Sequence, residues 1–153
     1  MGIRDAQFSD AKEISILSSQ FGWTASENEI KTRLEIILGR SDHQVFVYEG
    51  DAGKLFGWIH VGVDVILSSG KYGEVLAFVV REDARGSGIG GALLLRAEKW
   101  IADHACHATS IVIRCNNERK RTHEFYTRHG YDITMIGLRK KIDREASEMS
   151  GSV

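Results

Sequence analysis

A glycine-rich stretch from Val79 to Leu94, VVREDARGSGIGGALL, carries the clearest chemical signal in the sequence. It follows a β-prone segment and precedes a segment with helical periodicity, so the glycines fall where a strand ends and a helix begins. The first N–H groups of a helix have no internal partner, and the helix dipole adds about half a positive charge there. The stretch therefore predicts a site for an anion such as a phosphate.

Two overlapping patterns in this stretch indicate different ligands. Gly86, Gly88 and Gly91 spell the G-x-G-x-x-G of dinucleotide sites, whereas Arg85, Gly88 and Gly90 spell R-x-x-G-x-G. A dinucleotide-binding fold alternates strands and helices, usually with the glycines after its first strand. Three antiparallel strands are expected before the glycines here. An NADP-binding oxidoreductase is therefore the weaker alternative.

The elements that must position the glycines follow from apolar periodicity and turn residues. Strands are expected at 3–7, 45–48, 55–65, 72–80, 110–113, 131–133 and 138–142. Helices are expected from about residue 10 to 21, from a capping box at Ser26–Glu29 to Gly39, and over 89–104 and 118–129. This order predicts an α/β fold with a mixed, mostly antiparallel sheet of about seven strands, about four flanking helices and one β-α-β unit at the glycines.

Whole-chain properties limit the classes of function. The 153 residues predict one domain over 1–143 and a polar, frayed tail over 144–153. The formal net charge of -1 argues against nucleic-acid binding, and no apolar run is long enough to cross a membrane. No export signal is visible, so we expect a cytoplasmic protein in which Cys106 and Cys115 are free thiols. The scattered histidines predict no metal site.

The glycine stretch also resembles a known family when it is taken together with a second block. Arg85–Gly90 fits [RQ]-x-x-G-x-[GA], the acyl-CoA pyrophosphate loop of the GNAT N-acetyltransferases. About 40 residues on, the segment from Arg119 to Tyr131 is similar to the family's R-x-x-A-H-x-F-Y-x-x-x-G-[FY], with Thr122 in place of the alanine. Glu82 stands where the family more often has proline before the loop. The resemblance extends from about residue 3 to 142 and implies a GNAT-like fold.

The resemblance implies transfer of an acetyl group from acetyl-CoA to a primary amine, by direct attack in a ternary complex and most simply on a small molecule. It implies a cofactor site made by the end of a strand, the glycine loop and the end of the next strand: Phe78, Val79, Val80, Arg85, Gly86, Ser87, Gly88, Ile89, Gly90, Gly91, Asn116 and Asn117. The alternative role for Asn117 is to cap the following helix. A catalytically idle acyl-CoA-binding or sensing module on the same fold is the other alternative.

Two residues are candidates for the proton transfers. The resemblance assigns Tyr126, also a cofactor contact, as the acid that protonates the departing thiolate, whereas position alone would fit a core aromatic. Glu74 is the candidate base and a contact to the acceptor amine, with a relay through water as the alternative. By period-two alternation it should share a face of its strand with Tyr72, Leu76, Phe78 and Val80, where partial burial would raise the pKa of its carboxyl group.

The acceptor site is the least determined part of the sequence. Phe21 and Trp23 lie in the link between the first two helices, which usually forms the wall of the acceptor side in the family. The identity of the amine and the oligomeric state, a homodimer included, stay open.

Overall fold

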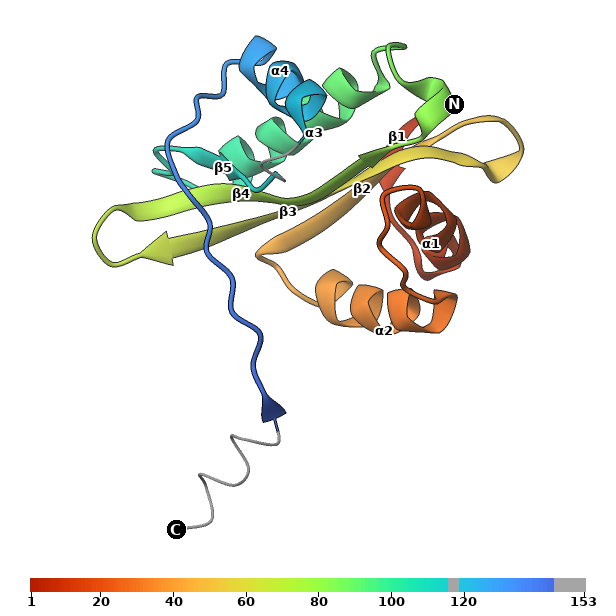
Figure 1. The fold of residues 1–153 in the computed structure, drawn as a ribbon, viewed down its shortest axis with the longest axis horizontal. Coiled ribbons are helices and arrows are strands. Elements are labelled where there is room, and N and C mark those ends of the chain that lie inside the picture. Colours follow the sequence, from red (N-terminus) through yellow and green to blue (C-terminus); the bar gives the residue numbers. More distant parts are fainter. Residues whose placement is uncertain (116–118, 145–153) are drawn as a thin grey trace. The chain divides into compact units, whose positions relative to one another are not determined.

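The computed structural model describes residues 1–115 and 119–144 (Figure 1). The chain divides into two compact units, Met1–Cys115 and Asn116–Val153. The first unit holds the sheet and three helices, and the second holds the last helix and the segment after it. None of the described helices is long and apolar enough to cross a membrane.

The first unit is built on a five-stranded mixed sheet whose strands are in sequential order. Its members are β1 (Gly2–Asp5), β2 (His43–Glu49), β3 (Leu55–Ile66), β4 (Gly70–Val80) and β5 (Ile111–Ile113). The first four pair antiparallel: two helices lie between β1 and β2, and short turns join β2 to β3 and β3 to β4. By contrast, β4 and β5 pair parallel, and a helix connects them. The predicted α/β class and mixed sheet are confirmed.

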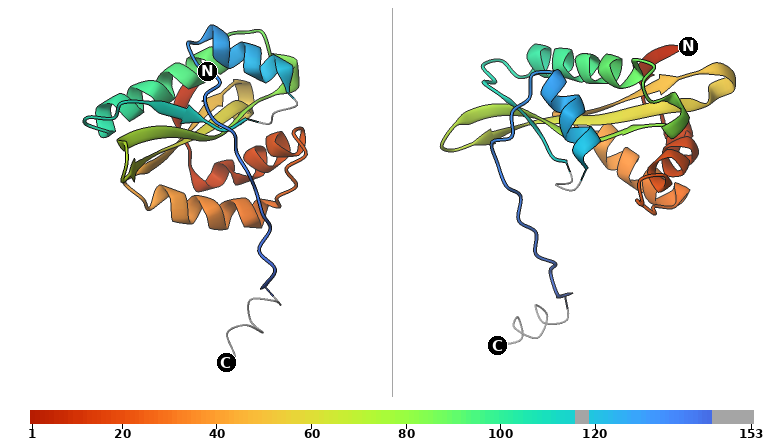
Figure 2. Two further views of the ribbon diagram at one scale, coloured as in Figure 1. Left: turned by 60° about the vertical axis from the view of Figure 1, so that its left-hand side comes forward. Right: turned by 45° about the horizontal axis from the view of Figure 1, so that its top comes forward.

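Helices cover both faces of this sheet. Figures 1 and 2 show α1 (Ala11–Ser19) and α2 (Glu27–Leu38) on one face and α3 (Ile89–His104) on the other. The capping box predicted for α2 is present: the Glu29 N–H donates to Ser26 Oγ at 3.2 Å, and the Ser26 N–H donates to Glu29 Oε2 at 2.7 Å. The apolar face predicted for α3 is buried as a set: Leu93, Leu94, Ala97, Trp100 and Ile101.

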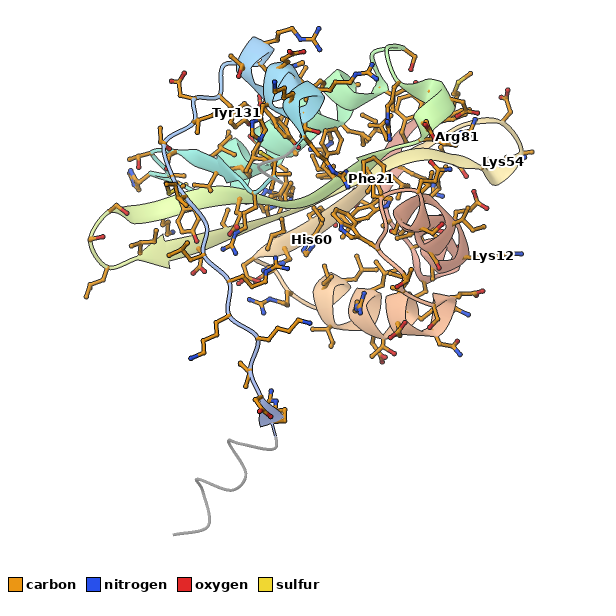
Figure 3. All side chains as sticks on the ribbon, in the orientation of Figure 1. Lys12, Phe21, Lys54, His60, Arg81 and Tyr131 are labelled. Carbon is orange, nitrogen blue, oxygen red and sulfur yellow. The ribbon has the colours of Figure 1, made fainter. Side chains whose placement is uncertain are left out.

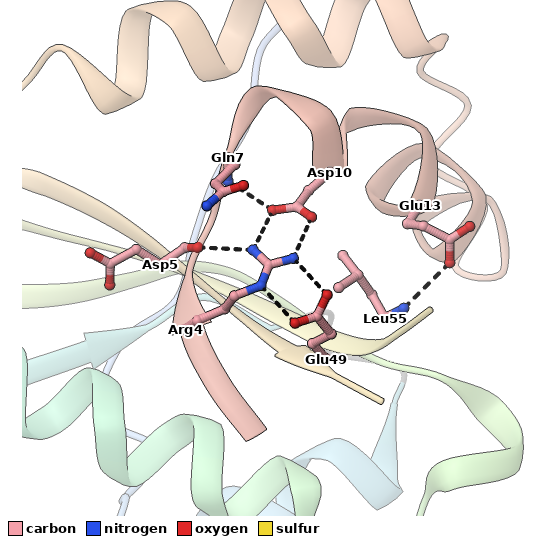
Figure 4. Close-up of polar contacts among 7 residues, drawn as sticks. All are labelled: Arg4, Asp5, Gln7, Asp10, Glu13, Glu49 and Leu55. Carbon is pink, nitrogen blue, oxygen red and sulfur yellow. Dashed lines mark hydrogen bonds and ion pairs between the residues drawn. The ribbon is translucent and has the colours of Figure 1, made fainter. Parts of the chain in front are cut away.

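A charged network fixes the start of the chain (Figure 4). The Arg4 guanidinium on β1 donates two hydrogen bonds of 2.8 Å to the Asp10 carboxylate and one of 3.0 Å to Glu49 on β2. Burial of Asp10 works to raise the pKa of its carboxyl group, but the hydrogen bonds from Arg4 and from the Gln7 N–H outweigh it and leave that pKa lowered. The network therefore anchors β1 to β2 at the beginning of α1.

A β-bulge interrupts the pairing of β3 with β4. His60 pairs with Ala77 and Val61 pairs with Val75, so Leu76 is an extra residue on β4. An extra residue reverses the alternation of side chains beyond it. The bulge therefore decides which residues of β4 face α1 and α2 and which face α3.

In the second unit, α4 (Lys120–Arg128) ends two residues before Gly130, whose positive φ stops the helix, as the sequence predicted. The strands predicted at 131–133 and 138–142 are wrong, because residues 131–143 contain no strand. Apolar residues of high β-propensity form a strand only where a second strand accepts their backbone hydrogen bonds, and here no ladder forms. Ile133, Ile136 and Leu138 are correspondingly exposed, and the described strand count is five rather than about seven.

Candidate functional site

The loop between β4 and α3 has a backbone that requires its glycines. A 3₁₀ turn over Glu82–Ala84 follows β4, and α3 begins at Ile89 with Gly88 as its N-cap. Gly86 and Gly88 have φ values of +79° and +87°, which glycine adopts without strain. A Cβ at either position would meet nothing within 4 Å, so the space above both residues is open.

The loop presents a run of unused hydrogen-bond donors. Within the described chain, no backbone N–H from Gly86 through Gly91 donates to a protein acceptor. The Ser87 hydroxyl instead donates to the Ala84 carbonyl oxygen and braces the turn. Free N–H groups at the N-terminus of a 16-residue helix form an anion site of the kind that binds phosphate. The geometry fits a pyrophosphate group.

Arg85 connects this loop to the link between α1 and α2. Its guanidinium carbon lies 5.0 Å from the centroid of the Phe21 ring, a cation–π geometry. Phe21 in turn packs against Trp23, with ring centroids 6.1 Å apart. The structure thus brings together residues that the sequence assigned to the cofactor loop and to the acceptor wall.

Strand β4 extends beyond its parallel partner. The ladder with β5 covers only Gly73–Val75, so β4 continues from Leu76 to Val80 with no described strand on that side. The Arg81 N–H donates to Phe56 O on β3 at 2.7 Å. This bond fixes which residues at the end of β4 hydrogen-bond to β3 through their backbone: Val79 does, and its two neighbours do not. The N–H and C=O groups of Phe78 and Val80 consequently point away from β3.

Glu74 is buried on β4, with 7% of its surface exposed. Its carboxylate accepts a hydrogen bond from Nε of Arg114, which follows β5 and forms an ion pair with it. The sequence predicted the burial but not this cationic partner. Arg114 is mostly exposed, so the pair lies where the sheet surface meets solvent.

The expected grouping of Glu74 with Phe78 and Val80 is wrong, because the Leu76 bulge separates them. Glu74 pairs with Gly62, which lies on the same side of β3 as Trp58, and that side packs against α1 and α2. Val80 pairs with Gly57, whose added Cβ would touch Leu93 of α3. Glu74 therefore lies on the α1–α2 face, whereas Phe78 and Val80 lie on the face that packs against α3.

A cavity of about 240 Å³ lies on this same face, between the sheet and helices α1 and α2. Its wall is mainly apolar and aromatic and includes Ile14, Trp23, Ile30, Leu34, Trp58 and His60. Trp23, predicted as an acceptor wall, lines it, whereas Phe21 does not line it and packs against Trp23. Sequence reasoning missed Trp58 and His60, although their two-residue spacing on β3 places them on one face.

His60 on β3 is a polar group in this wall. Its side chain is labelled in Figure 3. Burial, with smaller contributions from His43 and Arg40, lowers the pKa of His60 to about 4. Nδ1 of His43 lies 2.8 Å from Nε2 of His60, so one ring nitrogen donates to the other. The imidazole therefore adds hydrogen-bonding capacity without charge at neutral pH.

The indole N–H of Trp58 is the buried side-chain donor that lacks a hydrogen-bond partner in the described part of the chain. Trp58 is 8% exposed, and its ring lies 6.3 Å from that of Trp23 between centroids. A buried donor without an acceptor costs about 1–3 kcal/mol, so such groups are rare and often mark binding sites.

The second unit positions Tyr126 through the end of α4. The Tyr131 N–H donates to the Tyr126 carbonyl at 3.1 Å, and the Gly130 N–H donates to Thr127 O at 3.1 Å. With Gly130 at φ +89°, these bonds form a Schellman motif, and the Tyr126 and Tyr131 rings pack edge to face. The G-Y pair of the sequence block thus has a structural role: it orients the buried Tyr126.

Some predicted residues cannot be placed in a common site. Asn116 and Asn117 lie outside the described residues. Tyr126 belongs to the second unit, where its ring contacts Phe125 and Tyr131. Cys106 and Cys115 are free thiols, as predicted, and burial raises the pKa of Cys115. The described residues contain no cluster of three histidine, cysteine or acidic side chains that could hold a metal ion.

Comparison with known proteins agrees with this arrangement. Among solved structures, glucosamine-6-phosphate N-acetyltransferase from Arabidopsis thaliana is similar with a TM-score of 0.78 and 25% identity, over 92% of this chain and 97% of that one. A GNAT family acetyltransferase from Staphylococcus aureus has the same fold, with a TM-score of 0.74 and 23% identity, over 93% of this chain and 100% of that one.

Sequence comparison gives the family directly. An acetyltransferase of Yersinia enterocolitica is 27% identical over 150 residues, which cover 95% of this chain and 99% of that protein. The family model described as acetyltransferase (GNAT) family matches residues 9–131, which include the glycine loop and the block that ends in Gly130–Tyr131. This chain therefore belongs to the GNAT acetyltransferase family.

Proposed function

We propose that the protein transfers an acetyl group from acetyl-CoA to the primary amine of a small molecule, by direct attack in a ternary complex. The observation that carries this proposal is the run of free N–H groups from Gly86 to Gly91, next to a strand whose parallel ladder ends early. One feature fits a pyrophosphate, and the other fits an extended, amide-containing arm. Acetyl-CoA, which supplies the acetyl thioester, contains both groups.

The loop and the end of β4 would bind different parts of this cosubstrate. The loop N–H groups from Gly86 to Gly91, with Arg85 beside them, would bind the two phosphates. The backbone groups of Phe78 and Val80 would pair with the arm as an added strand does, leaving Val79 paired to β3. An N–H group at this strand end would also stabilise negative charge on the reacting carbonyl oxygen. Asn116 or Asn117 is a further proposed contact.

Glu74 would accept the proton that the acceptor amine must lose, directly or through water. Only the free amine has a lone pair to attack the acetyl carbon. Glu74 is buried on the face that carries the cavity, and Arg114 holds its carboxylate in one orientation. An oriented carboxylate near the incoming ammonium ion favours both binding and deprotonation.

Tyr126 would protonate the thiolate as the carbon–sulfur bond breaks. The assignment comes from its place in the family block, and the Schellman motif after α4 supports it because that motif fixes the Tyr126 backbone. The hydroxyl proton goes to sulfur, and the amine nitrogen gains the carbon that sulfur loses.

Acetylation of an amine panel tests the proposal. The acetylated amine is measured by mass spectrometry, since Cys106 and Cys115 would react with a thiol reagent. We expect turnover with acetyl-CoA and at least one amine, and an increase in melting temperature with acetyl-CoA. Tight acetyl-CoA binding with no acetylated amine would favour the idle binding module. Stabilisation by NADPH but not by acetyl-CoA would overturn the proposal.

A further inference from the structure

We propose that the acceptor is an α-amino acid with an apolar side chain: the side chain fills the cavity under α1 and α2, and the carboxylate pairs with Arg33. This inference rests on the proposed acetyl transfer and gives it a substrate class. The cavity lies entirely within the first unit and shares a face of the sheet with Glu74.

The size and the walls of the cavity favour an apolar group. Its volume of about 240 Å³ lies below the 300–1,000 Å³ typical of drug-sized ligand sites. One aromatic or branched aliphatic side chain suits that space. Trp23, Trp58, Ile30 and Leu34 all line the cavity, so burial of an apolar group there gains roughly 25 cal/mol per Å² removed from water.

The charges around the cavity favour a carboxylate and disfavour a second ammonium group. No carboxylate lines the wall, and His60 is neutral at pH 7. Arg33 on α2 lines the cavity and is exposed. Among the described residues it forms no ion pair within 4.0 Å, and its charge interacts at longer range with Glu29 on the same helix. A polyamine would therefore place a cation in an apolar, uncompensated environment, whereas an amino acid would match Arg33.

Trp58 provides a second, independent indication that a ligand binds here. Its buried indole N–H lacks an acceptor in the described part of the chain, and its ring is part of the cavity wall. The only acceptor that an apolar amino acid offers is its carboxylate, so we assign one carboxylate oxygen to Arg33 and the other to this N–H, which would remove the cost of the unpaired donor.

The sheet register places the amino group of such a ligand near Glu74. Along the face that carries the cavity, Ala77 and His60 form one pair and Glu74 and Gly62 the next. Two residues along a strand span about 6.6 Å, close to the distance between the side chain and amino group of an amino acid. Glu74 itself does not line the cavity, and the side chains of Leu76 and His43 lie beside Gly62. The amine of a ligand whose side chain fills the cavity would extend past these two side chains toward Glu74.

A panel of matched amines tests the substrate class. Phenylalanine and leucine are compared with phenethylamine, which lacks the carboxylate, with glycine, which lacks the side chain, and with glucosamine 6-phosphate. We expect the two apolar amino acids to have the highest kcat/KM. A preference for glycine, for phenethylamine or for glucosamine 6-phosphate would overturn the inference and leave the acetyltransferase proposal standing.

Two variants separate the carboxylate from the side chain. Arg33→Gln should lower kcat/KM for phenylalanine at least about fivefold and leave phenethylamine unchanged, because a charge-assisted contact is lost. Lys31→Gln is the matched control: it removes one charge from the same helix at a residue outside the cavity wall.

Ala25→Leu tests the side-chain pocket. It adds bulk in the cavity wall and should raise KM for leucine and phenylalanine, with folding checked by melting temperature. Equal effects of Arg33→Gln and Lys31→Gln, or no effect of Ala25→Leu, would contradict the inference.

A binding measurement distinguishes the two ways of failing. Trp23 and Trp58 line the cavity, so N-acetylphenylalanine should change tryptophan fluorescence saturably in the wild type and not in Ala25→Leu. Saturation without acetylation of any amine would refute the acetyl transfer and retain the cavity as a ligand site. Acetylation of other amines without saturation would refute the cavity site alone.

Discussion

His43 and His60 share a hydrogen bond of 2.8 Å between Nδ1 of the first ring and Nε2 of the second. The pair joins β2 to β3 on the face that carries the cavity, and burial holds His60 neutral. His60 thus contributes no charge to the floor of the proposed acceptor site at pH 7. Protonation of His60 should be unfavourable in the folded protein, so the protein should be less stable at low pH.

The free energy of unfolding should fall as pH falls from about 6.5 to about 4, and this part of the loss should level off below pH 4. The pKa of His60 is about 4 when folded and about 6.5 when unfolded, so the unfolded chain binds more protons in that interval. The shift corresponds to a loss on the order of 3 kcal/mol. Urea unfolding at several pH values measures it. His60→Gln should flatten the slope, whereas His107→Asn, at an exposed loop position, should preserve it. A wild-type slope unchanged in His60→Gln would contradict the assignment.

Gly88→Ala should weaken acetyl-CoA binding and lower the free energy of unfolding by about 1–2 kcal/mol, because a side chain at φ +87° is strained. Gly53→Ala is the matched control, since Gly53 has φ +73° in the turn between β2 and β3, away from the glycine loop. Both variants should lose similar stability, and Gly88→Ala alone should lose acetyl-CoA affinity in a calorimetric titration. Equal affinities would exclude the loop as the pyrophosphate site.

Glu74→Gln should reduce turnover most at low pH, where the acceptor amine is most protonated and a base matters most. It also removes the ion pair with Arg114, so melting temperatures must accompany the pH–rate profile. Asp64→Asn, an exposed carboxylate on β3, is the control and should leave the profile unchanged. A Glu74→Gln profile with the wild-type shape would remove Glu74 as the base.

Tyr126→Phe should lower kcat on the order of a hundredfold, because a positioned general acid contributes about 10²–10⁴-fold, while acetyl-CoA affinity stays nearly constant. Tyr131→Phe is matched to it: the two rings pack against each other, and each variant loses one hydroxyl. Single-turnover kinetics would separate the chemical step from product release. Equal losses in the two variants would indicate a packing role for Tyr126 rather than an acid role.

The sequence was most informative where one element depends on its own residues. The capping box at Ser26 and the apolar face of α3 are local patterns, and both are present as predicted. The glycine loop was predictable because the left-handed backbone at Gly86 and Gly88 tolerates few other residues. The family resemblance added the activity that these local patterns alone leave open.

The sequence was least informative where two distant segments must meet. The Leu76 bulge arises from the pairing of β4 with β3, and no residue type in β4 indicates it. The sequence therefore wrongly placed Phe78 and Val80 on the same face as Glu74. The cavity requires α1 and α2 to pack on β3, which periodicity within any single segment does not encode. The prediction of strands at 131–133 and 138–142 was wrong because β-propensity alone does not provide a neighbouring strand with which they could pair.

Because Leu76 is an extra residue in β4, the proposed activity depends on the number of residues in this strand. Loss of one residue there would restore simple alternation and force a choice: either Glu74 turns toward α3 or the segment from Ala77 to Val80 exchanges its two faces. Either outcome would separate the proposed base from the cavity or replace Ala77 and Val79 in the core beneath α1. Single-residue deletions in this strand should therefore abolish activity even where the protein still folds. Substitutions at Leu76 that keep the chain length should be tolerated far better.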